Sequence, residues 1–261
     1  MAIPQISIVG AGNLAWHLGP ALDNCGYVID EVYSRNEKSA KQLVNRLYQA
    51  EIKKDLDFRD SQSTVFILAV SDEAISEIAQ KIHIPNGATL VHTSGSQDME
   101  LLQNGYTENL GVFYPLQTFT AGRKVDFNEI PICIEAANKP TWKLLKAISR
   151  SLSSKVYHIN SATRMFLHLS AVLSCNFTNH LFTISQDILI EQGFDLNILK
   201  PLIVETINKS LEIGPDNAQT GPAFRGDLTV LEQHMKELKN NKAISKIYQS
   251  ITQHILDTYH G

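Results

Sequence analysis

Short apolar runs and segments of helical spacing alternate over the first 155 or so residues of this 261-residue chain. Each apolar run is too short for a helix and suits a strand that is buried on both faces of a parallel sheet. Strands that alternate with helices predict an α/β fold, with a doubly wound, mainly parallel sheet between two layers of helices. The expected strands lie at 6–9, 64–70, 88–93, 109–114, 131–135 and 156–157, with one more that ends at 33–35, and the expected helices include 37–48, 72–82 and 139–152.

From Ser161 onward only helical spacing is left, which predicts helices over 162–192, 196–213 and 228–259. The glycines and prolines of 214–227 exclude a continuous helix between the last two. The length of the chain allows one large domain or two smaller ones. The change of pattern favours two, an α/β domain over residues 1–158 and an all-α domain over residues 159–261.

The stretch from strand 6–9 to residue 35 has the layout of a complete dinucleotide-binding unit of the Rossmann type. Its turn reads Gly10-Ala11-Gly12-Asn13-Leu14-Ala15, which fits the pattern G-x-G-x-x-G/A. The first glycine makes a tight turn, the second lets the pyrophosphate approach the backbone, and Ala15 keeps helix and strand close. The N–H groups and the dipole of the following helix favour an anion. We therefore expect Gly10, Gly12, Asn13 and Leu14 to bind a dinucleotide.

The end of the second strand predicts which dinucleotide is bound. An acidic residue there would favour NAD, but this chain has Ser34 and Arg35, whose hydroxyl and guanidinium suit the 2′-phosphate of NADP. Asp30 and Glu31 lie at the start of the strand, away from the phosphate turn. The alternative for Arg35 is a solvated surface charge, and Lys38 could either assist or belong to an ordinary helix surface.

Ligands of open parallel sheets lie outside the carboxyl ends of the strands, so the residues after each strand are candidates for the site. We expect Val70, Ser71 and Ser94 beside the cofactor, and Tyr114 and Gln117 beside the substrate. The alternative for the two serines is a role in helix caps and turns. For Asp72, which follows Ser71, a helix cap is the expected role.

Two polar residues of the helix predicted over 162–192 are candidates for catalysis. His168 and Asn176 are eight residues apart, so on a regular helix both can face one cleft. The imidazole could donate a proton and the amide could orient a substrate oxygen. A histidine among apolar neighbours could equally be a satisfied core residue.

The glycine-rich segment 214–227 adds two candidates for substrate binding, Thr220 and Arg225. Arg225 could clamp a carboxylate or pair with Asp227, which could itself cap the next helix.

Charge and cysteine content narrow the range of partners. With 23 basic and 27 acidic side chains the net charge is -4, which gives no reason to expect nucleic acid or an anionic membrane. Three separate cysteines in apolar segments predict buried, reduced thiols. No leader segment, membrane span or metal-ligand spacing is evident. We therefore expect a cytoplasmic protein with a small-molecule substrate and no metal.

The chain resembles a bacterial family of provisionally assigned NADP oxidoreductases, in which a Rossmann-like domain precedes a helical domain of unassigned function. The residues that carry the resemblance are Gly10-Ala11-Gly12-Asn13, Ser34-Arg35, Phe66-Ile67-Leu68-Ala69-Val70-Ser71-Asp72, His92-Thr93-Ser94-Gly95, Pro115-Leu116-Gln117-Thr118-Phe119 and Thr220-Gly221-Pro222-Ala223-Phe224-Arg225-Gly226-Asp227. More distantly, the chain is similar to pyrroline-5-carboxylate reductase, deazaflavin-dependent NADP oxidoreductases and the 6-phosphogluconate dehydrogenase superfamily.

That resemblance implies that the helical domain forms a homodimer and completes an active site between the domains. It implies a catalytic role for His168 and Asn176, which fall on the helix that carries catalytic groups in several relatives. Tyr114 stands where relatives often have histidine. The lysine of the hydroxyacid dehydrogenases has no counterpart on the 162–192 helix.

Three functions fit these observations. The first is an NADP(H)-dependent oxidoreductase that transfers hydride to or from a small carbonyl or imine. The second is a sensor or regulatory protein that binds NADP(H) without turnover. The third is electron exchange with a flavin or deazaflavin, which requires a second planar ligand.

Overall fold

The computed structural model describes residues 3–261, and their contacts divide the chain into two compact units. The first unit ends at Val172 and the second runs from Leu173 to Gly261. The sequence predicts a domain boundary after residue 158, whereas the boundary between the two compact units falls after helix α5 (Ser161–Ala171). Helix α5 therefore groups with the sheet.

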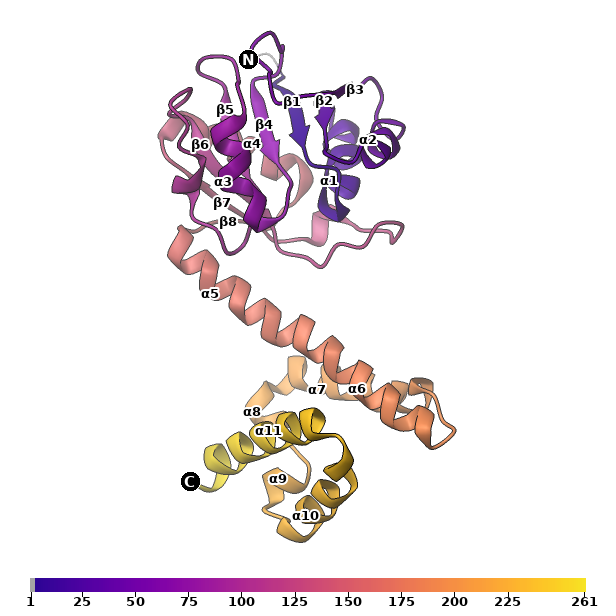
Figure 1. Cartoon of the computed structure of the whole chain (residues 1–261). Helices are drawn as coiled ribbons and strands as arrows, with labels where there is room; N and C mark the ends of the chain where they lie inside the picture. Colours follow the sequence, from indigo (N-terminus) through magenta and orange to yellow (C-terminus); the bar gives the residue numbers. More distant parts are fainter. Residues whose placement is uncertain (1–2) are drawn as a thin grey trace. The chain divides into compact units, whose positions relative to one another are not determined.

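The first unit is built on one eight-stranded sheet with the order β3-β2-β1-β4-β5-β6-β7-β8 (Figure 1). All neighbouring strands are parallel except β6 and β7, which are antiparallel. The predicted α/β, mainly parallel fold is confirmed. The short edge strand β3 was not expected from the sequence. The strands are β1 (Gln5–Val9), β2 (Val28–Tyr33), β3 (Glu51–Lys53), β4 (Val65–Leu68), β5 (Thr89–His92), β6 (Leu110–Pro115), β7 (Ile132–Ala136) and β8 (Val156–His158).

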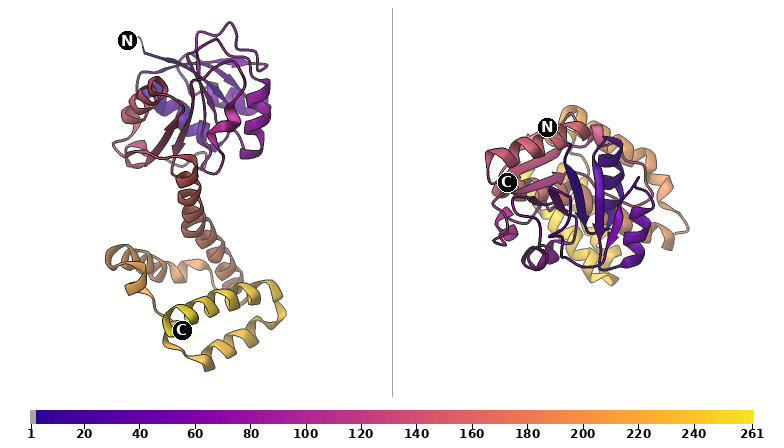
Figure 2. Two further views of the ribbon diagram at one scale, coloured as in Figure 1. Left: turned by 90° about the vertical axis from the view of Figure 1, so that its left-hand side faces the viewer. Right: turned by 90° about the horizontal axis from the view of Figure 1, so that it is seen from above.

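Helices cover both faces of this sheet (Figure 2). Ile67 of β4 belongs to a core with α1, α2 and α4, while its neighbour Leu68 belongs to a second core with α3. This change of face at every residue follows from the pleat of a strand. The helices of the layers are α1 (Asn13–Asn24), α2 (Glu37–Val44), α3 (Asp72–Lys81) and α4 (Lys139–Leu152), with short 3-10 turns at Met99–Leu102 and Phe127–Glu129. Helix α2 ends earlier than expected.

The second unit is all helical, as its spacing predicts. A π-helix (Val172–Phe177) separates α5 from α6, and the expected last helix is broken between α10 and α11. Only Ala223 and Leu231 of this unit are buried. The helices are α6 (Thr178–Glu191), α7 (Lys200–Ile213), α8 (Pro215–Ala218), α9 (Pro222–Arg225), α10 (Leu228–Glu237) and α11 (Lys242–His260), with 3-10 turns at Leu196–Leu199 and Leu238–Asn240.

Candidate active site

A cavity of about 540 Å³ lies in the first unit, against the turns that follow β1, β2, β4 and β5. All nine residues that the sequence assigns to the cofactor line it: Gly10, Gly12, Asn13, Leu14, Ser34, Arg35, Val70, Ser71 and Ser94. Residues after four different strands meet there because the carboxyl ends of parallel strands share one edge of the sheet.

The two glycines of the turn between β1 and α1 differ in their surroundings. Gly10 has a φ of +113°, and a Cβ there would lie against the Ala69 carbonyl, 2.7 Å from its carbon. Its N–H donates to the Tyr33 carbonyl, 2.7 Å away, which ties the turn to the end of β2. At Gly12 a Cβ would meet nothing within 4 Å, and no side chain caps α1. Open space at a helix N-terminus with uncapped N–H groups suits a pyrophosphate.

The end of β2 and the start of α2 form the part of the cavity that is suited to a 2′-phosphate. Ser34 and Arg35 line it, and the exposed guanidinium of Arg35 forms no ion pair with any residue of 3–261. Asn36 and Ser39 also line it, and the Asn36 side chain accepts from the Ser39 N–H at 3.3 Å. Neither was assigned to the cofactor from the sequence, although Asn36 stands at the tip of the second strand and asparagine directly before a helix is a capping signal.

The acidic residues of β2, Asp30 and Glu31, do not line the cavity, but they lie in the middle of the strand and not at its start. The Glu31 carboxylate accepts from Ser7 and Ser61 and pairs with Lys53 at 3.6 Å. Lys38 does not line the cavity.

The serines after β4 and β5 have different roles. Ser71 precedes α3 but makes no side-chain cap, and the expected cap by Asp72 is wrong because Asp72 is the first residue of the helix. Its carboxylate instead accepts from the Ser96 hydroxyl. Ser94 lines the cavity, and its hydroxyl oxygen accepts from the N–H groups of Ser96 and Gln97 at 3.1 Å each. Ser94 thus also stabilises a turn.

Tyr114 and His168, far apart in sequence, form a hydrogen-bonded pair. The Tyr114 hydroxyl lies 3.1 Å from His168 Nδ1, and both side chains are half-buried. Gly95 packs against them, since a Cβ at this position would lie 2.6 Å from Tyr114 Cζ and 2.7 Å from His168 Nδ1. Burial raises the pKa of Tyr114 to about 12, so the phenol stays protonated near neutral pH. A tyrosine and a histidine that share a proton can serve as a proton donor.

Other candidate residues lie elsewhere. Gln117 lines a polar pocket with Arg123 and does not line the cofactor cavity. Asn176 lies within the π-helix, where the regular α-helical spacing that relates it to His168 does not hold. Thr220 and Arg225 belong to the second unit.

Contacts near these candidates give two further results. No ion pair joins Arg225 to Asp227, whose carboxylate caps α10 through the Val230 N–H at 3.4 Å. The expectation of buried thiols holds for Cys133 only, because Cys25 and Cys175 are exposed.

Two features are absent from residues 3–261. Histidine, cysteine and acidic side chains do not gather in threes at any place that could hold a metal ion. None of the helices combines the length and apolar character that crossing a membrane requires.

The glycine turn, the parallel sheet and the cavity at its carboxyl edge define a dinucleotide-binding protein of the Rossmann type. Residues 2–112 match a Rossmann-like domain family, and residues 130–255 match a domain family of unknown function, DUF2520. The chain is 38% identical to a Bacteroides fragilis protein provisionally described as an NADP oxidoreductase, with a TM-score of 0.89 over 98% of both chains. It belongs to the same family as that protein, as its motifs indicate.

Two more distant structures share the fold. One is an Aspergillus terreus reductive aminase in complex with NADPH and ethyl-5-oxohexanoate, 12% identical over 100% of this chain and 96% of that one, with a TM-score of 0.74. The other is a Plasmodium falciparum pyrroline carboxylate reductase with NADP bound, 12% identical over 98% and 97% of the chains, with a TM-score of 0.58. The expected distant similarity to pyrroline-5-carboxylate reductase is confirmed. None of the curated protein sequences matches the chain.

Proposed function

We propose that this protein is an NADPH-dependent reductase of a small carbonyl or imine compound. The observation that carries the proposal is the hydrogen-bonded pair of Tyr114 and His168, which touches Gly95 next to the cavity-lining Ser94. A candidate proton donor therefore contacts the residue that directly follows Ser94, and Ser94 lines a cavity suited to a dinucleotide. The family of the Bacteroides fragilis protein and the two NADP(H) complexes of the same fold support the choice of cofactor.

Five residues have a role in this proposal: Gly12, Ser34, Arg35, Tyr114 and His168. The coenzyme, when bound, would supply the hydride that the substrate carbon receives. Tyr114 donates its hydroxyl proton to the substrate oxygen or nitrogen, so that the C=O or C=N bond becomes a single bond. His168 returns a proton from Nδ1 to the phenol oxygen and regains one from solvent. Gly12 and the start of α1 would hold the pyrophosphate, and Ser34 and Arg35 would hold the 2′-phosphate.

Arg35→Ala is expected to weaken NADPH binding by about 10-fold to 100-fold and to leave NADH binding unchanged. The reason is the loss of a charge-assisted contact worth about 1.5–3 kcal/mol to a phosphate that NADH lacks. Titration of the fluorescence of each coenzyme with protein measures both affinities. Lys38→Ala is the matched control, because this exposed lysine of the same helix start does not line the cavity. Equal affinities for the two coenzymes in wild type and variant would contradict the assignment.

Turnover is tested by following NADPH oxidation with small keto acids, aldehydes and cyclic imines. Loss of NADPH absorbance that depends on both protein and substrate is the expected result. NADPH binding without turnover of any of these compounds would favour a sensor instead.

We also propose that two copies pair through the helical unit. Large apolar side chains remain exposed on it, among them Leu211 at 83% and Leu202 at 64% on α7. The unit also contains a largely apolar cavity of about 460 Å³ between α6, α9, α10 and α11. With only two buried residues, the unit lacks a core of its own. A second copy would cover the exposed apolar side chains of the first and would offer its own apolar cavity to them.

Size-exclusion chromatography with light scattering, at micromolar protein concentration, is expected to give twice the mass of one chain. Leu211→Glu should shift the protein toward monomer, since it places a charge on the most exposed apolar side chain of α7. Tyr48→Glu, at an 82% exposed position of the first unit, is the matched control and should stay dimeric. A monomeric wild type would overturn the pairing.

A further inference from the structure

Three residues of neighbouring strands lie side by side on one face of the sheet. His92 of β5 pairs in register with Val112 of β6, and Val112 pairs with Glu135 of β7. Residues in register point to the same face, and Tyr114 lies two positions beyond Val112 on β6. Glu135 and Tyr114 therefore face the same side of the sheet, one pleat apart.

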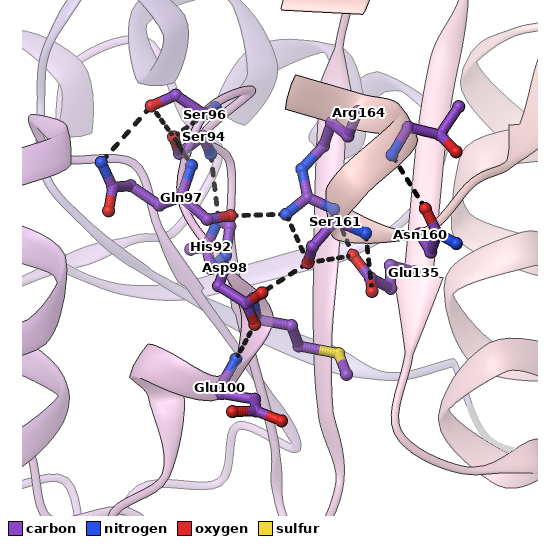
Figure 3. Close-up of polar contacts among 12 residues, drawn as sticks. His92, Ser94, Ser96, Gln97, Asp98, Glu100, Glu135, Asn160, Ser161 and Arg164 are labelled. Carbon is purple, nitrogen blue, oxygen red and sulfur yellow. Dashed lines mark hydrogen bonds and ion pairs between the residues drawn. The ribbon is translucent and has the colours of Figure 1, made fainter. Parts of the chain in front are cut away.

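Arg164 of α5 joins this face to the loop after β5 (Figure 3). Its side chain is 1% exposed, and Nη1 forms an ion pair with Glu135. Nη2 donates to the Gln97 carbonyl and, at 3.0 Å, to the Ser161 hydroxyl, which in turn donates to Glu135 at 2.8 Å. A planar guanidinium can make these contacts together, whereas a single ammonium cannot reach them with the same geometry.

The spacing along α5 matches the spacing along β6. His168 follows Arg164 by four residues, so it lies on the same side of the helix about 6 Å further on. Two residues of a strand, from Val112 to Tyr114, cover about 6.6 Å. A helix that is anchored at Arg164 beside Glu135 therefore brings His168 against Tyr114, where the 3.1 Å hydrogen bond forms.

The loop from Ser94 to Asp98 is held from both ends. Arg164 holds the Gln97 carbonyl, and His92 Nδ1 accepts from the Ser94 N–H at 3.1 Å. Burial and the nearby Arg164 cation lower the pKa of His92 to about 4, so its ring stays neutral and keeps this acceptor. Gly95, between the two anchors, is the residue that packs against Tyr114 and His168.

We propose that Arg164 is a positioning residue, which sets the Tyr114–His168 pair by fixing helix α5 and the Ser94–Asp98 loop to the same point of the sheet. This inference rests on the proposed function, because it concerns the pair that donates the proton. Arg164 itself is buried and contacts other protein groups, so it acts through His168 and Gly95 and not on the substrate.

The test measures the contact between Tyr114 and His168 directly, in protein without coenzyme or substrate. Histidine labelled with ¹³C gives a ring resonance for His168, identified by its loss in His168→Gln. In the wild-type background Tyr114→Phe is expected to move this resonance, because it removes the hydroxyl bound to Nδ1. In Arg164→Lys the same substitution should move it by about half as much or less, since lysine keeps the charge but not the fork. In Arg164→Met it should not move the resonance.

Arg59→Lys is the matched control, because Arg59 pairs with Asp57 on the exposed surface and should leave the tyrosine effect unchanged. Circular dichroism and melting curves establish which variants are folded, and Arg164→Lys alone decides if Arg164→Met does not fold. A tyrosine effect of wild-type size in either folded variant would overturn the proposal, as would loss of fold in both. The experiment measures no turnover, so its result does not depend on whether a substrate of the proposed reductase is found.

Discussion

Gly10→Ala is expected to lower the free energy of unfolding by about 2–6 kcal/mol. The backbone at Gly10 has a φ of +113°, which costs a residue with a Cβ about 1–3 kcal/mol. In addition, the new methyl would lie 2.7 Å from the Ala69 carbonyl carbon and 2.9 Å from Val70 Cγ1, and such overpacking costs about 1–3 kcal/mol. Urea unfolding measures the loss as a lower midpoint at constant slope.

Gly12→Ala is the matched control for this experiment. Gly12 has a φ of -84°, and a Cβ there would meet nothing within 4 Å. The substitution should cost the fold less than about 1 kcal/mol, as expected for alanine at a helix N-cap. It should nevertheless weaken NADPH binding at least about 10-fold, because the methyl stands where the pyrophosphate approaches the backbone. Unchanged NADPH affinity in Gly12→Ala, or full stability in Gly10→Ala, would contradict the roles given to the two glycines.

Tyr114→Phe and His168→Gln are each expected to reduce kcat by about 10²–10⁴-fold, the usual contribution of a positioned proton donor. NADPH affinity should stay within about two-fold of wild type, since neither side chain lines the coenzyme cavity. The double variant should be no slower than the slower single variant, because residues that act as a unit are not additive. Steady-state kinetics on the best substrate of the screen, together with coenzyme titrations, measure these quantities.

The pH dependence of kcat checks the same assignment. With its pKa raised to about 12, Tyr114 does not ionise in the range of an ordinary assay, so its ionisation should cause no loss of activity below about pH 11.

Tyr106→Phe is the matched control for Tyr114→Phe, because Tyr106 also packs against a histidine, His83, with ring centroids 5.2 Å apart. Wild-type turnover in Tyr114→Phe, or an equal loss in Tyr106→Phe, would remove Tyr114 from the reaction.

The coenzyme cavity illustrates what local sequence can predict. The glycine turn, Ser34-Arg35 and the residues after β4 and β5 each follow a strand, and a parallel sheet brings such positions to one edge whatever the details of packing. Asn36 and Ser39 were missed although a capping signal was present. Asp72 was misjudged because its partner, Ser96, lies in a different loop.

The pair of Tyr114 and His168 and the buried Arg164 illustrate the opposite case. Tyr114 and His168 were separate candidates in the sequence, and no motif assigned a role to Arg164, which stands among the apolar residues of its helix. Their relation depends on the antiparallel placement of β7, which sets Glu135 beside Val112, and on the packing of α5 against that face. Neither feature leaves a pattern in the residues nearby.

The sequence by itself determined the α/β and helical halves of the chain and the dinucleotide turn, and it predicted a phosphorylated coenzyme, because each depends on residues close together along one strand, turn or helix. Only the tertiary structure decided which polar side chains meet: Tyr114 with His168, Arg164 with Glu135, and Asp72 with Ser96. Such pairs join residues 24 or more positions apart, and their contact depends on strand order and helix packing, which no local spacing encodes.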